Sequence, residues 1–474
     1  MKYIKAIAAA AVIAAAVPAS VCADGAVRMD YNSDGAVDIF DMVSARKNGA
    51  SAAELEKLSN FLLGMDIGEA DTDGYKLVWS DEFDGNTLDM DKWSYELGNW
   101  KLDDNGNYIT NGWGNNEQQF YTSENTAVKD GILTIAAKHE KWTDEVQGSY
   151  DYTSSRISTA HKFSTCGGRI EVRAKCSSGK SLWPAIWMLP EDSAYGGWAS
   201  SGEIDIMEGW GSTPEKICGT IHFGGAWPNN TYLTNDYKFT EGDGTQNWHT
   251  YSIEWERGEI RWYVDDVLYS TQTDWYSDGF SYPAPFDQNF YIILNLAVGG
   301  HFDGIDGIYG DPTIFADGEK DFNIDYVRVY EKTGSEFTPT EMTSLPLDNY
   351  IEGADASVAN KEGCTVVTVK NAGTLEYGVM GLLRAREVKA GEKHTISFDI
   401  SSTVERSMVL TAEDSTYTRY LDEKLALTPE KKHYSFDVVF PNDMKADIKF
   451  QLGNIDDAAS LGQHEITISD ITWN

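Results

Sequence analysis

The chain has 474 residues, more than one ordinary hydrophobic core accommodates, so two or three domains are expected. Its 75 acidic residues outnumber its 38 basic residues and give a formal net charge of -37. A charge of this size and sign repels nucleic acids and anionic polysaccharides, which excludes them as partners, and it favours neutral or cationic ones.

Residues 1–23 have the pattern of a secretory signal. Lys2 and Lys5 form a basic start, an apolar run follows over Ala6–Val17, and Val21-Cys22-Ala23 suits a cleavage site. The apolar run is too short to span a membrane, and no later run is long enough. The sequence therefore predicts a secreted, extracellular protein without membrane insertion.

Cleavage would leave four cysteines, which are too few for a disulfide scaffold in a chain of this length. Cys166 and Cys176 flank one expected strand, whose extension keeps the two thiols apart. We therefore expect the stability of the protein to come from its apolar cores.

Residues 24–66 contain an acidic loop with the spacing of a calcium site. The twelfth loop position is Asp rather than the Glu of EF-hands, which resembles a dockerin repeat, as does the apolar pattern that leads into a helix. Dockerins attach secreted enzymes to cohesin scaffold proteins, so the resemblance implies a cohesin partner. Because Ala50–Gly64 has a helical pattern but no second acidic loop, a calcium-stapled helical pair without a scaffold is the alternative. The expected Ca²⁺ ligands are the side chains of Asp30, Asn32, Asp34, Asp38 and Asp41 and the carbonyl of Ala36.

Residues 67–74 are short and acidic and are typical of a linker, and from Tyr75 the chain changes to short strands separated by turn residues. This pattern predicts that residues 75–332 form an all-β sandwich, curved enough to hold a groove. The expected strands include Lys76–Trp79, Ile132–Ala136, Arg169–Lys175, Thr250–Trp255, Ile260–Val264, Tyr291–Leu296 and Tyr326–Tyr330.

Residues 333–344 have the composition of a polar linker. The pattern of residues 345–474 predicts a second β-rich unit. Apolar residues alternate cleanly within it, for example at Ile396, Phe398 and Ile400 and again at Ile466 and Ile468. The unit is long enough to bury its own core, so a second, smaller β-sandwich is expected.

The stretch Glu203–Glu208 alternates acidic and apolar residues, which predicts a strand with its acids on one face. In an unbroken strand Glu208 would point into the core, where a lone carboxylate is too costly to bury. A β-bulge near Ile206–Met207 takes up one residue and returns Glu208 to the acidic face beside Glu203 and Asp205. A solvated acidic strand face without chemistry is the alternative interpretation.

Paired carboxylates of this kind are what glycoside cleavage requires. One carboxylate attacks the sugar while a second, kept protonated, gives its proton to the departing oxygen. Glu203 and Glu208 offer these groups, and Asp205 between them could hydrogen-bond Glu203 and orient it. Three close acids titrate as a coupled group, which tends to leave one of them protonated near neutral pH.

Just upstream, Trp183 and Trp187 share one face of an extended segment, as sugar-stacking side chains would, although sandwich cores also use tryptophan. The segment reads Trp-Pro-Ala-Ile-Trp-Met-Leu-Pro and is followed by Gly-Glu-Ile-Asp-Ile-Met-Glu. Together they resemble glycoside hydrolase family 16, specifically its bacterial laminarinase-type endo-β-1,3-glucanases. Matches in the same order begin at Leu77–Gly85, pass through Asn115–Gln118 and end at Asn323–Tyr330.

This resemblance implies a β-jelly-roll with its cleft on a concave sheet and a retaining double displacement. Carried onto this sequence, Glu203 is the nucleophile, Glu208 the acid/base and Asp205 the assisting acid. The resemblance also implies sugar-binding roles for Asn115, Arg156, Trp183, Trp187, Trp198 and His222. For Arg156 an ion pair with structural acids, and for His222 a structural role, are the alternatives.

The same family often holds a structural calcium on the convex side of the sandwich. The matching ligands in this sequence would be Glu82, the Gly131 carbonyl and Asp325.

The extra residue between Asp205 and Glu208 favours the laminarinase-like branch, because mixed-linkage glucanases have the shorter spacing that needs no bulge. We therefore expect a β-1,3-glucan substrate, with a mixed-linkage β-1,3-1,4-glucanase or a galactan-type hydrolase as the alternative. A non-catalytic glucan-binding protein would need the loss of one or both glutamates, and both are present.

The C-terminal unit resembles carbohydrate-binding modules of the family 4/9 type, through Val388–Phe398 and Phe450–Gly453. The resemblance suggests Tyr417, Arg419 and Tyr420 as sugar contacts. A purely structural sandwich is the alternative.

Overall fold

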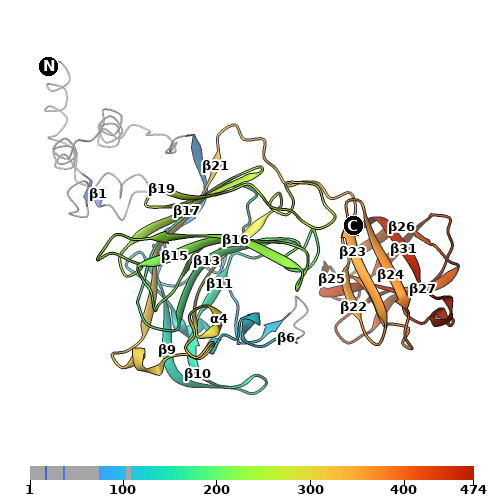
Figure 1. Ribbon diagram of the computed structural model, residues 1–474, viewed down its shortest axis with the longest axis horizontal. Coiled ribbons are helices and arrows are strands. Elements are labelled where there is room, and N and C mark those ends of the chain that lie inside the picture. Colours follow the sequence, from blue (N-terminus) through green and yellow to red (C-terminus); the bar gives the residue numbers. More distant parts are fainter. Residues whose placement is uncertain (1–16, 19–35, 38–73, 103–107) are drawn as a thin grey trace, which may run out of the picture.

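The computed structural model describes residues 17–18, 36–37, 74–102 and 108–474 (Figure 1). The expected signal sequence, calcium loop and first linker lie almost entirely outside the described residues. In that part of the chain, β1 (Val17–Pro18) pairs antiparallel with β2 (Ala36–Val37). Among the described residues, no helix is both long and apolar enough to cross a membrane.

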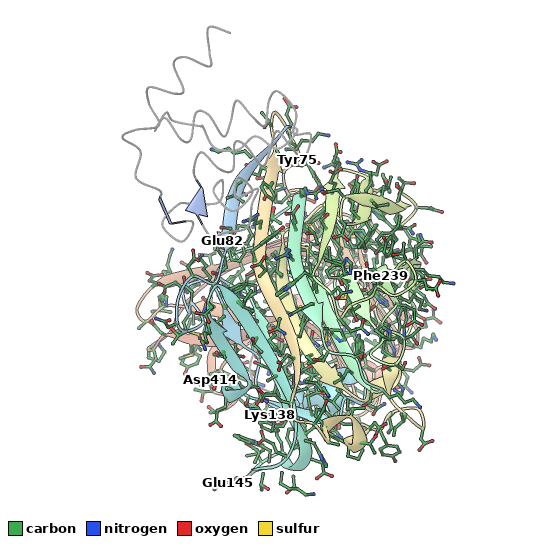
Figure 2. All side chains as sticks on the ribbon, turned by 90° about the vertical axis from the view of Figure 1, so that its left-hand side faces the viewer. Tyr75, Glu82, Lys138, Glu145, Phe239 and Asp414 are labelled. Atoms are coloured by element: carbon green, nitrogen blue, oxygen red, sulfur yellow. The ribbon has the colours of Figure 1, made fainter. Side chains whose placement is uncertain are left out.

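Residues 75–332 fold into two packed sheets, of which the first has ten strands. Its strands are β3 (Tyr75–Asp81), β7 (Gln119–Tyr121), β8 (Thr126–Lys129), β9 (Ile132–Asp144), β10 (Gly148–Ser154), β12 (Gly168–Cys176), β17 (His249–Glu256), β18 (Glu259–Val264), β19 (Val267–Gln272) and β21 (Lys320–Lys332). They lie in the order β19-β18-β17-β12-β21-β9-β10-β7, with β3 paired to β21 and β8 paired to β9. The long hairpin of β9 and β10 extends to Glu145 at one end of the molecule, opposite Tyr75 (Figure 2).

The second sheet has seven strands and carries the acidic motif. Its strands are β4 (Ser94–Tyr95), β11 (Arg156–Ser158), β13 (Leu182–Pro190), β14 (Glu203–Gly209), β15 (Lys216–Gly224), β16 (Asn230–Lys238) and β20 (Phe290–Val298). The order is β16-β15-β14-β13-β20-β11-β4, so the motif strand β14 lies between β13 and β15. A separate hairpin and four short helices complete this body: β5 (Lys101–Leu102), β6 (Tyr108–Thr110), η3 (Gly112–Gly114), η4 (Ser123–Asn125), α4 (Gly300–Asp303) and η5 (Pro312–Phe315).

One apolar core joins the two sheets. Ile170 and Val172 of β12 contribute from the first sheet, and Ile186 of β13 and Ile204 of β14 contribute from the second. All the strands expected between residues 75 and 332 lie inside observed strands, so the mainly-β prediction is confirmed. The four cysteines in the described part of the chain are free, as expected, and the core rather than crosslinks stabilises the body.

Residues 345–474 form two five-stranded sheets that enclose a core of their own, drawn from orange to red in Figure 1. Ile396, Phe398 and Ile400 are buried in it, as their alternation predicted. One sheet has the order β22-β25-β30-β27-β28 and the other β23-β24-β31-β26-β29. The elements are β22 (Asp348–Ile351), β23 (Asp355–Lys361), β24 (Cys364–Asn371), β25 (Val379–Val388), β26 (Lys393–Ser402), β27 (Arg406–Glu413), β28 (Arg419–Leu427), β29 (Lys432–Val439), β30 (Met444–Gln451), η6 (Ala458–Leu461) and β31 (His464–Trp473).

The segment 333–344, which we expected to be a polar linker, is packed against the first body. Phe337 meets Trp255 edge to face, with ring centroids 6.0 Å apart. The backbone N–H of Thr340 donates to the Asp287 carbonyl at 2.9 Å, and Met342 packs against a small apolar cluster beside β13. A few apolar side chains in a polar segment are therefore enough to fix it on the sandwich.

Candidate active site

A β-bulge lies in β14 at the position that the sequence predicted. β15 pairs Asp205 with Thr220 and Glu208 with Cys218, so the two β14 residues between the acids stand opposite the single residue Gly219. The register with β13 shifts at the same point. The extra residue brings Glu208 onto the face of Glu203 and Asp205, which we call the acidic face.

The bulge is completed by a residue from the other sheet. Trp262 of β18 is 1% exposed and donates its indole N–H to the Asp205 carbonyl at 2.9 Å. A Cβ atom on Gly219 would lie only 2.4 Å from Cδ1 of that indole. Glycine opposite the bulge therefore leaves the space through which Trp262 satisfies a carbonyl that the irregular ladder leaves exposed. Sequence reasoning missed both residues.

Two tryptophans hold the two glutamates. Trp198 donates its indole N–H to Oε2 of Glu203 at 2.8 Å. Trp183 donates to Oε1 of Glu208 at 3.0 Å. Both indoles were predicted to contact sugar, and the structure adds that each fixes the orientation of one carboxylate.

Burial and neighbouring charges raise the pKa of Glu208 and of Asp205. Burial raises the pKa of Glu208 to about 7, and the neighbouring Glu203 charge adds to the rise, while hydrogen bonds from Trp183 and Cys218 oppose it. Burial, followed by the charges of Glu203 and Glu208, raises the pKa of Asp205 well above its ordinary value. Burial and the Glu203 charge therefore leave Glu208 able to hold a proton near neutral pH.

Asp205 differs from expectation in one respect. We expected it to hydrogen-bond Glu203, but its Oδ2 has no hydrogen-bond partner in the described part of the chain. The polar atom that faces Oδ2 is Nε2 of His222, at 3.5 Å, and the same nitrogen lies 3.7 Å from Oε1 of Glu203. His222 thus belongs to the acidic face, with its ring between Trp198 and Tyr232, each 5.6 Å away between centroids.

Arg156 supports the neighbouring tryptophans instead of standing open to a ligand. Its side chain is nearly buried, its guanidinium lies 4.3 Å from the Trp113 ring centre and 4.7 Å from that of Trp187, and its Nε pairs with Glu96 at 2.5 Å. The alternative expected for this residue, an ion pair with a structural acid, is the arrangement observed.

A chain of hydrogen bonds beneath the second sheet links two further predicted residues. Trp187 donates to Oδ1 of Asn295 at 2.7 Å, and Asn295 donates to the Tyr121 hydroxyl at 3.1 Å. Tyr121 donates to Glu117 at 2.9 Å, and Glu117 also accepts from Asn115 at 3.3 Å. Trp187 and Asn115 are therefore held by one buried network, with the Asn115 amide turned toward Glu117.

Several groups near the acids had no signal in the motif. Phe302 of α4 stacks on Trp183 and on Trp210, with centroids 4.9 Å and 4.4 Å apart, which extends an aromatic surface away from Glu208. Burial and Arg156 lower the pKa of Lys101, and its other charged neighbours include Glu203. The high aromatic content of the sequence is consistent with the stacked rings, but it does not predict which aromatic residues lie near the acids.

The residues expected to hold a calcium ion on the other side of the sandwich do not fit one as arranged. Glu82 (labelled in Figure 2) accepts two hydrogen bonds from the Arg328 guanidinium, at 2.9 and 2.6 Å. Asp325 is paired with Arg173, and Gly131 lies in the tight turn between β8 and β9. Two guanidinium groups thus already occupy the carboxylates that the ion would need.

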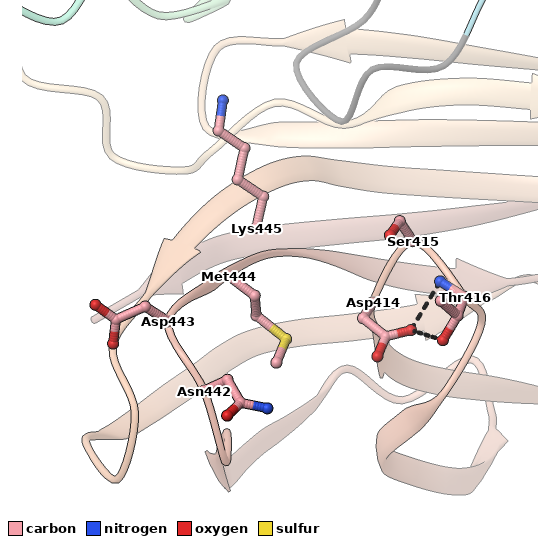
Figure 3. Close-up of a pocket in the computed structure, with 7 residues that line it drawn as sticks. All are labelled: Asp414, Ser415, Thr416, Asn442, Asp443, Met444 and Lys445. Atoms are coloured by element: carbon pink, nitrogen blue, oxygen red, sulfur yellow. Dashed lines mark hydrogen bonds between the residues drawn. The ribbon is translucent and has the colours of Figure 1, made fainter.

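A pocket of about 450 Å³ lies in the C-terminal body (Figure 3). Asp414 in its wall accepts hydrogen bonds from the backbone N–H and the hydroxyl of Thr416, at 2.8 and 2.7 Å, and these bonds lower its pKa to about 2. The carboxylate therefore anchors the turn between β27 and β28 and is not poised for acid chemistry. The lining residues are Asp414, Ser415, Thr416, Asn442, Asp443, Met444 and Lys445.

Comparison with known proteins agrees with this site. Residues 113–326 match the model of glycosyl hydrolases family 16. The chain is 45% identical over 268 residues to glucan endo-1,3-beta-glucosidase A1 of Niallia circulans, a match that covers 55% of this chain and 38% of that protein. It is 40% identical over 265 residues to a glucan endo-1,3-beta-glucosidase of Cryptopygus antarcticus, covering 53% of this chain and 90% of the relative. The laminarinase catalytic domain of Thermotoga maritima is 38% identical and aligns with 55% of this chain and 99% of its own, with a TM-score of 0.47.

The thiol of Cys218 lies 3.8 Å from Oε2 of Glu208. Substitutions of Cys218 should therefore change the pH dependence of kcat/KM. If protonated Glu208 is the proton donor, kcat/KM should fall as pH rises through about 7. Cys218→Ala removes a donor to the carboxylate, so the pKa of Glu208 should rise and the basic limb should move to higher pH. Cys218→Ser supplies a stronger donor and should move the limb to lower pH.

The measurement is the midpoint of the basic limb of kcat/KM for the wild type and the two variants. Cys176→Ala, at a buried cysteine of β12 in the other sheet, is the matched control and should leave the midpoint unchanged. Shifts of the same sign for Ala and Ser would contradict the role assigned to the thiol.

Proposed function

The chain belongs to the glycosyl hydrolases of family 16 and is an endo-acting β-glucan hydrolase, and we propose that it cleaves β-1,3-glucan with retention of anomeric configuration. One observation carries the proposal: Glu203 and Glu208 share a face and have different protonation environments. Trp198 holds Glu203, whereas Glu208 is held by Trp183 and Cys218 and has its pKa raised to about 7.

In the proposed reaction, a carboxylate oxygen of Glu203 attacks the anomeric carbon and forms a glycosyl ester. The glycosidic C–O bond breaks at the same time, and Glu208 gives its proton to the departing oxygen. A water molecule then enters, Glu208 takes one of its protons, and the oxygen bonds to the anomeric carbon while the ester to Glu203 breaks. Each inversion cancels the other, so the product keeps the configuration of the substrate.

Asp205 is proposed to assist Glu203. Burial and the charges of the two glutamates raise the pKa of Asp205 well above its ordinary value, which favours its neutral form. In that form Asp205 adds no second negative charge beside the proposed nucleophile.

The preference for β-1,3 bonds rests on the spacing of the acids. The bulge in β14 accommodates one residue more between Asp205 and Glu208 than the shorter motif of mixed-linkage glucanases. The relatives from Niallia circulans and Cryptopygus antarcticus, which are named for endo-1,3-β activity, support the same preference. A mixed-linkage glucanase or galactan-type hydrolase is the competing proposal within this family.

Glu203→Ala and Glu208→Ala should each abolish measurable hydrolysis of laminarin. Loss of the proton donor should cost about 10²–10⁴-fold in kcat, and loss of the nucleophile at least as much, because no glycosyl ester can form. The measurement is reducing-end release, with the product anomer followed by NMR in the first minutes of the wild-type reaction.

Asp278→Ala is the control: Asp278 is exposed, follows β19 and lies outside the acidic face, so the variant should retain activity. Parallel assays on laminarin, curdlan, lichenan and agarose separate the proposed specificity from the alternatives. Activity confined to lichenan or agarose would replace the β-1,3 proposal, and an α-anomer as the first product would exclude retention.

For the C-terminal body we propose glycan binding through exposed tyrosines. Tyr417, in the turn between β27 and β28, is 76% exposed, and Tyr350 and Tyr377 are 38% and 44% exposed. A hydrogen bond to Glu352 is the main cause that raises the pKa of Tyr350, and Tyr377 and Tyr417 add to the rise. Exposed aromatic rings suit the apolar faces of sugar rings.

The other two residues suggested by the resemblance are engaged within the protein. Arg419 pairs with Glu413 and Asp422, each at 3.1 Å. Tyr420 donates its hydroxyl to Asp414 at 2.9 Å, and its ring packs against Phe440. The proposed contact therefore narrows to Tyr417, whose side chain stays 76% exposed with Lys449 Nζ 4.9 Å from its ring centre, and to Tyr350 and Tyr377.

Tyr417→Ala in the full chain should weaken retention on insoluble curdlan by about threefold to tenfold, the value of one aromatic contact. Hydrolysis of soluble laminarin should stay at the wild-type rate, because the residue lies outside the body that carries the acids. Val439→Ala, an exposed apolar position on β29 of the other sheet, should change neither quantity. Unchanged retention of the Tyr417 variant would support a purely structural sandwich.

The N-terminal region, residues 1–66, has sequence features of export and of calcium binding. We propose export directed by residues 1–23 and one Ca²⁺ held by the loop Asp30–Asp41, with cohesin binding as the function of the resulting helical unit. The oxygen-ligand spacing supports the ion, and the dockerin-like twelfth ligand supports the partner.

Asp34→Ala, which removes a central loop ligand, should lower the calcium stoichiometry of the secreted protein by one per chain, measured by equilibrium dialysis. Immobilised cohesin should capture the wild type in calcium and release it in a chelator. Calcium binding without capture under any condition would favour the calcium-stapled unit that has no scaffold partner.

A further inference from the structure

Three side chains of the acidic face converge in the way that metal ligands do. Nε2 of His222 lies 3.5 Å from Oδ2 of Asp205 and 3.7 Å from Oε1 of Glu203. One ligand atom from each residue lies within 4.8 Å of the other two. In a tetrahedral zinc site with bonds of about 2.0–2.1 Å, neighbouring ligand atoms are about 3.4 Å apart. Two of the three separations are already close to that value.

A second observation marks the same point. The Asp205 side chain is 3% exposed, and its Oδ2 has no hydrogen-bond partner in the described part of the chain. A buried carboxylate oxygen without a partner is costly. The atom is directed at His222, so the unsatisfied group faces into the triangle of ligands.

The remaining polar contacts leave the triangle open. Trp198 binds Oε2 of Glu203, so Oε1 is the oxygen on the His222 side. Nε2 is the ring nitrogen of His222 on the side of the acids, and in the tautomer with its proton on Nδ1 it has a lone pair that a metal ion can accept. Imidazole nitrogens and carboxylate oxygens are both zinc ligands, and three protein ligands leave a fourth position open.

We propose that Glu203, Asp205 and His222 bind a Zn²⁺ ion and that this ion inhibits the enzyme. The fourth coordination position is left to water. The ion occupies the carboxylate of the proposed nucleophile, so zinc and β-glucan exclude one another. The binding itself does not depend on the proposed function; only its effect on turnover does.

The types of ligand atom determine which metal this site selects, and the hydrogen bonds to the ligands affect its zinc affinity. Mg²⁺ and Ca²⁺ need six or more oxygen ligands, which three side chains with one nitrogen do not supply. Nδ1 of His222 is buried without a hydrogen-bond partner in the described part of the chain. Outer partners of metal-bound histidines contribute roughly 10–100-fold in affinity, so this site should bind zinc correspondingly more weakly than a dedicated zinc enzyme.

The test is zinc binding by isothermal titration calorimetry to the full chain, with calcium in large excess to saturate the N-terminal loop. Wild type should bind one Zn²⁺ at this site. His222→Gln and Asp205→Asn should each weaken that binding by more than the roughly 10–100-fold that loss of an outer partner costs. His433→Gln is the matched control, because His433 is an exposed histidine that contacts one carboxylate, Asp399, at 2.7 Å in the C-terminal body.

Two further measurements complete the test. Laminarin should displace the ion, and Zn²⁺ should raise the apparent KM of wild-type hydrolysis without lowering kcat. Zinc binding that is equal in wild type, His222→Gln and Asp205→Asn would overturn the proposal. In a protein that hydrolyses laminarin, zinc binding that laminarin leaves unchanged would overturn it as well. Zinc binding without any glucan hydrolysis would refute the proposed function and leave this site standing; hydrolysis without zinc binding would do the reverse.

Discussion

A carboxylate cannot be turned into an apolar core without a partner, and the geometry of the acidic face follows from that constraint. Regular alternation would send Glu208 toward the core residues that β14 buries. The bulge prevents this, but it breaks the ladder beside Asp205 and needs both space and a donor. Gly219 provides the space and Trp262 provides the donor. The position of Glu208, the proposed proton donor, therefore depends on two residues that lie away from its carboxylate.

Once on one face, the acids are distinguished by their partners. Trp198 donates to Glu203, while Glu208 receives an indole N–H and a weak thiol. Asp205 is the most buried of the three and has an oxygen without a partner. Burial and the neighbouring negative charges raise the pKa of both Asp205 and Glu208. The Asp205 oxygen without a partner also makes this corner of the face attractive to a metal ion.

The sequence predicts those features of the structure that depend on a local pattern of residues. Alternation located the strands, and broken alternation located the bulge, because both depend on which side of one strand a residue faces. Contacts between sheets are not encoded at any fixed spacing, so the roles of Gly219 and Trp262 could not be predicted. Ion pairing escapes prediction for the same reason, as the Arg328 partner of Glu82 shows. The polar composition of residues 333–344 predicted a linker, and it did not predict that Phe337 packs against Trp255.

That packed segment links the two bodies to the acidic face. The hydroxyl of Thr340 donates to Asp287 at 2.6 Å, and Asp287 accepts from the Tyr195 hydroxyl, also at 2.6 Å. The backbone N–H of Tyr195 donates to Ser201 at 3.0 Å, which fixes the two ends of the loop that carries Trp198. Trp198 orients the proposed nucleophile. Residues 333–344, which their composition predicts to be a linker, therefore help to position a residue of the site. The C-terminal body is thus attached through the same buried network that holds one wall of the acidic face.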